Sequence, residues 1–125
     1  MNLLLDSHVL LWALHAPDRL SSEARDAISD PGRVVYFSAA SAWELEIKAT
    51  KGKLKLPAEW LHAATETGFV ELPVSAADAQ RSARLPAHHA DPFDRLLVAQ
   101  AMARGLHLVT RDGMLTAYGV PLLQA

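Results

Sequence analysis

The sequence contains no cysteine, so disulfide bonds and thiolate-held zinc sites are excluded. Any bound metal would need oxygen or imidazole ligands, and the lack of cysteine fits a reducing compartment such as the cytoplasm. No stretch approaches the roughly 18 consecutive apolar residues of a membrane span. A basic segment followed by a long apolar one, typical of a secretory signal, is also missing. We therefore expect a globular, cytoplasmic domain without a membrane anchor.

An excess of positive charge is missing as well. The 12 lysine and arginine residues face 14 acidic residues, a formal net charge of -2, so overall charge does not favour nucleic-acid binding. The lysines, however, are concentrated in one eight-residue stretch: Lys48, Lys51, Lys53 and Lys55. This stretch predicts either a local phosphate-binding patch or a solvated helix end.

The 125 residues, half of them apolar, are enough for one domain over residues 1–125 with one core. Short apolar runs predict strands at 2–5, 34–37, 69–72 and 106–110, with an edge strand at 120–123. Capping residues, proline and glycine predict helices at 8–14, 21–30, 41–50, 57–68, from 75 onward, 92–105 and 112–119. Apolar strands that alternate with helices predict an α/β fold, with a central parallel sheet covered on both faces.

Four acidic residues lie just after predicted strands or at the start of a helix: Asp6, Glu44, Asp94 and Asp112. The carboxyl ends of parallel strands share one edge of the sheet, where α/β ligand sites form. We therefore expect these four side chains to converge.

Each acid also has a purely structural interpretation. Asp6 and Asp112 are plausible N-caps, Glu44 would close a capping box with Ser41, and Asp94 is a first-turn acid favoured by the helix dipole. Asp91 is expected to cap the helix that begins at Pro92.

Convergence would require a compensating positive charge. Two carboxylates about 4 Å apart repel by about 1 kcal/mol in water and by roughly 4 kcal/mol at an effective dielectric constant of 20. Arg95 and Arg111 each adjoin one of the acids in sequence, so they face away from it on a helix. A divalent cation with oxygen ligands, Mg²⁺ or Mn²⁺, is the better compensation.

Histidine offers a competing metal site. His88 and His89, followed by Asp91, would suit Zn²⁺ or Mn²⁺, but no His-x-x-x-His spacing supports that alternative. The three tryptophans, Trp12, Trp43 and Trp60, lie among apolar helix residues and are predicted to pack in the core.

Several ordered motifs together resemble the PIN-domain ribonucleases, specifically the VapC-type toxins of bacterial toxin-antitoxin pairs. They are Leu3-Leu4-Leu5-Asp6-Ser7-His8, Ser38-Ala39-Ala40-Ser41-Ala42-Trp43-Glu44, Gly52-Lys53-Leu54, His89-Ala90-Asp91-Pro92-Phe93-Asp94-Arg95 and Thr110-Arg111-Asp112. The resemblance spans residues 3–118. One departure is Ser7, where threonine is common in this branch; serine keeps the hydroxyl group.

The resemblance implies a three-layer α/β/α domain and a metal-dependent endoribonuclease. Asp6, Glu44, Asp94 and Asp112 would form the catalytic site, with Asp6, Asp94 and Asp112 holding Mg²⁺ and Thr110 beside them. RNA would be bound with the help of Lys51, Lys53 and Arg95. A protein antitoxin would cover the pocket, and a homodimer is common in this family. The alternatives are a non-catalytic PIN-like binding module and a metal phosphoesterase that cleaves DNA.

Overall fold

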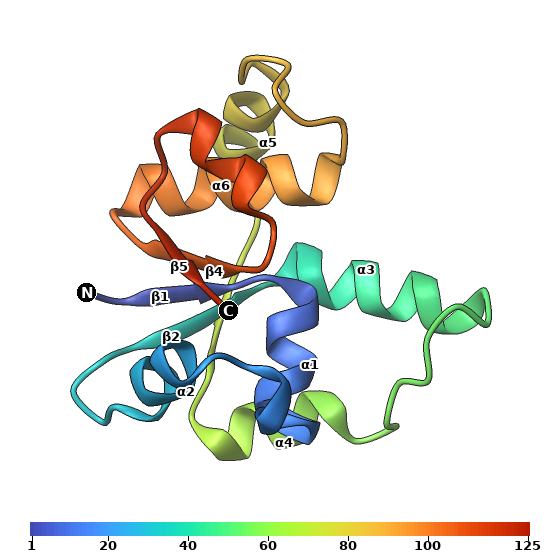
Figure 1. The fold of residues 1–125 in the computed structure, drawn as a ribbon. Helices are drawn as coiled ribbons and strands as arrows, with labels where there is room; N and C mark the ends of the chain where they lie inside the picture. The colour runs from blue at the N-terminus through green and yellow to red at the C-terminus, as the bar shows by residue number, and fades with distance from the viewer.

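The computed structural model describes residues 1–125 and contains one five-stranded sheet (Figure 1). The strands are β1 (Leu3–Leu5), β2 (Val35–Ser38), β3 (Val70–Leu72), β4 (His107–Thr110) and β5 (Leu122–Gln124). Their order is β3-β2-β1-β4-β5, and every neighbouring pair is parallel. The predicted α/β class is therefore confirmed.

Helices cover both faces of the sheet. They are α1 (Ser7–His15), α2 (Ser22–Ser29), α3 (Ala39–Thr50), α4 (Trp60–Thr67), α5 (Ala76–Ala83) and α6 (Pro92–Arg104), with two 3-10 helices, η1 (Pro17–Arg19) and η2 (Gly113–Tyr118). Figure 1 shows α1, α2 and α4 on one face and α5 and α6 on the other, while α3 extends away from one edge. The result is the three-layer arrangement.

Alternation along the strands divides the core in two. Leu3 and Leu5 of β1 pack with Val9 and Leu10 of α1. Leu4, between them, faces the opposite side and packs with the helix α6. Successive strand residues point to opposite faces, so a strand with apolar residues at every position is buried on both sides. This explains why the central strands are continuous apolar runs.

Two helix boundaries differ from the prediction. Helix α3 begins at Ala39, because the Ser38 hydroxyl caps it by accepting from the Ala40 N–H. Ser41 is therefore inside the helix, where its hydroxyl has no hydrogen-bond partner, and the predicted Ser41-Glu44 capping box is wrong. Helix α4 begins at Trp60 rather than Pro57, because the chain from Pro57 turns first and the Trp60 N–H donates to the Pro57 carbonyl.

The tryptophans do not share one environment. Trp60 is buried and packs edge-on against Phe37, as predicted for a core residue. Trp43 is 65% exposed, so its predicted core position is wrong. Trp43 lies on the exposed side of α3. Its ring packs edge-on against Phe93 at the start of α6, with ring centroids 5.6 Å apart. None of the helices has the length and apolar character needed to cross a bilayer.

Candidate active site

A polar pocket of about 260 Å³ lies at the carboxyl edge of the sheet. The central position of β1 places the residues that follow β1, β2 and β4 side by side at this edge. The residues lining the pocket are Asp6, Ser7, His8, Trp12, Glu44, Lys48, Asp91, Asp94, Thr110, Arg111 and Asp112. All four predicted acids are thus brought together, and Asp91 joins them.

Asp6 links the sheet to α1. Its backbone N–H donates to the Val109 carbonyl of β4, and its carboxylate caps α1 by accepting from the Val9 N–H at 2.8 Å. Only 9% of the residue is exposed, and this burial raises its pKa above the ordinary value. The Thr110 hydroxyl and the Val9 N–H offset part of the shift. Asp6 is therefore both the N-cap and a wall of the pocket.

Glu44 already has a positive partner. The Ser7 hydroxyl donates to Oε1 at 2.9 Å, and Lys48 Nζ donates to Oε2 at 2.7 Å. Lys48 lies one turn further along α3, the favourable order for a glutamate-lysine pair on a helix. Of the four lysines, Lys48 is the one that lines the pocket.

Asp94 lacks such a partner among the lysine and arginine residues. Burial, together with the nearby charges of Asp91 and Asp6, raises its pKa to about 7. Asp94 lies in the first turn of α6, which Asp91 caps by accepting from the Phe93 and Asp94 N–H groups, as predicted. The raised pKa means that the ionised form of Asp94 is unfavourable here, and a nearby cation would stabilise that form.

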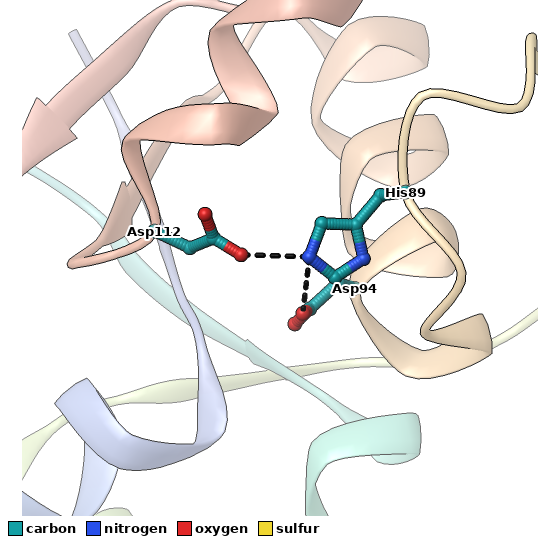
Figure 2. Close-up of side chains that lie close together, drawn as sticks. All are labelled: His89, Asp94 and Asp112. Carbon is teal, nitrogen blue, oxygen red and sulfur yellow. Dashed lines mark hydrogen bonds and ion pairs between the residues drawn. The ribbon is translucent and has the colours of Figure 1, made fainter.

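Asp112 contacts a histidine that sequence reasoning did not place with it (Figure 2). His89 Nε2 lies 2.7 Å from Asp112 Oδ2 and 3.8 Å from Asp94 Oδ2. His88, by contrast, is exposed and packs edge-on against Tyr118. The competing alternative, in which His88 and His89 share one metal site, is therefore not supported. The one signal for His89 in the sequence is its position two residues before the N-cap Asp91.

Arg95, expected from the resemblance to help bind RNA, has partners within the protein. Its guanidinium donates to the carbonyl oxygens of Ser82, Leu85 and Pro86 at 2.9 to 3.0 Å, and it contacts Tyr118 Oη at 3.2 Å. These bonds use the donors that would bind an RNA phosphate, so Arg95 instead holds the chain before α6.

The basic residues Lys51, Lys53 and Arg111 differ in their position relative to the pocket. Lys51 and Lys53 are exposed beyond the end of α3 and do not line the pocket. Arg111 does line it, and its guanidinium lies 4.1 Å from the centroid of the Trp12 ring. Thr110 is buried, and its hydroxyl accepts from the Asp112 N–H. The pocket is thus lined by five acidic residues and by two basic residues, Lys48 and Arg111.

The donor set suits a hard divalent cation. Asp6, Asp94 and Asp112 offer carboxylate oxygens, which Mg²⁺ and Mn²⁺ prefer. Glu44 is neutralised by Lys48, whereas Asp94 has no lysine or arginine partner and a raised pKa. A cation bound beside Asp94 would remove this imbalance.

Comparison with known proteins identifies the family. A PIN domain family model matches residues 3–120. The chain is 33% identical over 122 residues to "Ribonuclease VapC22" of Mycobacterium tuberculosis, covering 94% of this chain and 92% of that protein.

Solved structures share the fold. The VapBC2 complex of Rickettsia felis, bound to a promoter DNA fragment, contains a chain with a TM-score of 0.75, 14% identity and coverage of 99% and 98%. The DNA-bound VapBC complex of Salmonella typhimurium matches with a TM-score of 0.73, 17% identity and coverage of 99% and 98%. FitAcB of Neisseria gonorrhoeae matches with a TM-score of 0.63, 22% identity and coverage of 97% and 96%.

Proposed function

Because the chain belongs to the PIN-domain family and resembles a VapC ribonuclease along nearly its whole length, we propose that it is a metal-dependent endoribonuclease and the toxin of a toxin-antitoxin pair. The observation that carries the proposal is the convergence of Asp6, Glu44, Asp94 and Asp112 on one pocket. Asp94, which is crowded by other carboxylates and has no lysine or arginine partner, supports a cation there.

Asp6, Asp94 and Asp112 would hold Mg²⁺, or Mn²⁺ in its place. When bound, the cation lowers the pKa of a water molecule and neutralises charge that develops on the phosphodiester. Hydrolysis transfers the water oxygen to phosphorus and breaks the bond from phosphorus to the leaving ribose oxygen, which takes up a proton. Asp6 is positioned for this role by its cap bond and by the end of β1.

Glu44 orients two neighbouring side chains of the pocket. Its bonds to Ser7 and Lys48 hold its carboxylate in place and keep the lysine ammonium at the pocket. In this arrangement Lys48 can approach a phosphate oxygen while Glu44 positions the attacking water. Thr110 supports Asp6 from the neighbouring strand.

RNA would cross from the pocket to the end of α3. Lys51, Lys53 and Lys55 are exposed there, at every second position of the chain. Lysines attract phosphates without reading base sequence, so their contribution depends on salt.

An antitoxin would silence the site. The solved structures that share the fold include two named VapBC2 and VapBC. An arginine from the antitoxin could pair with two carboxylates at once and so exclude the cation from Asp94 and Asp112. We also expect a homodimer and a cytoplasmic location.

The test compares matched RNA and DNA strands with Mg²⁺ and with EDTA. Cleavage of RNA alone, dependent on Mg²⁺, is the expected result. Cleavage of DNA would favour a different metal phosphoesterase, and Mg²⁺ binding without cleavage of either strand would favour a binding module.

A further inference from the structure

The segment between α5 and α6 delivers His89 to the pocket. This segment has no regular secondary structure, yet both backbone groups of His89 are hydrogen-bonded. Its N–H donates to Tyr118 Oη at 2.9 Å, and its carbonyl accepts from Arg95 Nη1 at 3.4 Å. Since Arg95 also holds the carbonyls of Leu85 and Pro86, the position of the histidine is set by the surrounding structure.

The hydrogen bonds of the ring assign its tautomer. The Asp91 backbone N–H donates to His89 Nδ1 at 3.2 Å, so Nδ1 presents a lone pair and carries no proton. The neutral ring therefore carries its proton on Nε2, which donates to Asp112 Oδ2 at 2.7 Å (Figure 2). A ring nitrogen that carries a proton has no lone pair for a metal. If the proton were on Nδ1 instead, the Nδ1–H and the Asp91 N–H would both be donors and would face each other without an acceptor.

The other oxygen of Asp112 is also fixed. The Met114 N–H donates to Oδ1 at 3.0 Å, while His89 holds Oδ2. Two donors on the two oxygens restrict rotation of the carboxylate, and each oxygen keeps a second lone pair.

We propose that His89 is a positioning residue of the nuclease site, which orients Asp112 toward the cation through its Nε2–H and is not itself a metal ligand. The inference rests on the function proposed above. Outer partners that hydrogen-bond a ligating group typically change metal affinity by about 10-fold to 100-fold when removed. His89 acts on the cation through Asp112 in this way.

The most direct test is the imidazole ¹⁵N NMR spectrum of the full chain, recorded without metal and with saturating Mg²⁺. The expected result is that His89 shows a protonated Nε2 and an unprotonated Nδ1 in both spectra. Loss of the Nε2 proton when Mg²⁺ binds would make His89 a ligand and overturn the inference. Averaged signals from both tautomers would show a ring free in solvent and would also overturn it.

Variants supply a second measurement, the affinity for Mg²⁺ by calorimetry. His89→Ala is expected to weaken binding about 10-fold, and His89→Gln, whose amide can still donate to Asp112, is expected to recover part of the loss. His88→Ala is the matched control, because its ring lies on the same segment but packs against Tyr118. Unchanged affinity in His89→Ala would contradict the inference.

The two proposals fail in different ways. If the parent binds Mg²⁺ with His89 as a ligand, only the positioning role is lost. If Mg²⁺ binds and affinity depends on His89 as expected but RNA is not cut, the positioning role stands and the nuclease function is lost. If the parent binds no Mg²⁺, both are contradicted, whatever tautomer the metal-free spectrum shows.

Discussion

Asp94 gives the site a pH dependence that can be measured without substrate. The folded protein keeps the Asp94 proton up to about pH 7, whereas the unfolded chain loses it near the ordinary value of 3.8. Between these pH values the folded state binds more protons, so this group makes the metal-free protein less stable as pH rises. Above pH 7 the full cost of the ionised, crowded carboxylate is present.

Replacement of Asp94 by asparagine should remove that cost. In EDTA at pH 8, Asp94→Asn is expected to be about 2 kcal/mol more stable than the parent, with the difference shrinking toward pH 4. Thermal unfolding at both pH values measures it, and Asp26→Asn, at an exposed position on α2, is the control. A stabilisation that did not change between pH 4 and pH 8 would contradict this account of Asp94.

At the scale of elements, the start of α6 depends on Arg95. Its guanidinium donates to several carbonyls of the preceding segment, a task that needs the planar fork of an arginine. Arg95→Lys keeps the charge but loses most of these bonds, so we expect a loss of about 2 kcal/mol in stability. Thermal unfolding beside the exposed control Arg84→Lys measures the loss. An unchanged melting temperature would contradict this structural role of Arg95.

The exposed lysines beyond the end of α3 are expected to attract the RNA backbone. Replacing Lys51, Lys53 and Lys55 together with glutamine should lower the slope of log affinity against log salt by about 2. Cleavage at saturating RNA should stay unchanged, because these lysines do not line the pocket. RNA binding to the parent and the triple variant at several salt concentrations, with Arg33→Gln as a control before β2, measures the slope. If the slope did not change, the lysines would have no part in binding.

The elements and the gathering of the acids could be predicted from the sequence, because strands buried on both faces are continuous apolar runs and parallel strands share a carboxyl edge. The contacts between individual side chains could not be predicted in this way. Trp43 lies on an alanine-rich helix whose faces differ little in polarity, so the order of polar and apolar residues does not show that Trp43 is exposed. His89 meets Asp112 across 23 residues, and the partners of Arg95 are backbone carbonyls that sequence does not display.

At the scale of the whole molecule, the sheet order explains the site. The central strand β1 ends just before Asp6. Glu44, Asp94 and Asp112 come from three other parts of the chain, and the order of the strands brings them beside Asp6. Such a site requires the complete fold, and the PIN family model matches residues 3–120.

The most direct test of the account is cleavage of a structured RNA pool by the purified chain and by Asp6→Asn and Asp94→Asn. Asparagine is as good an N-cap as aspartate, so Asp6→Asn keeps the start of α1 while it removes the charge. We expect cleavage by the parent with Mg²⁺, none with EDTA, and loss of cleavage in both folded variants. Cleavage that persisted in EDTA or in either variant would contradict a carboxylate-held metal as the centre of this enzyme.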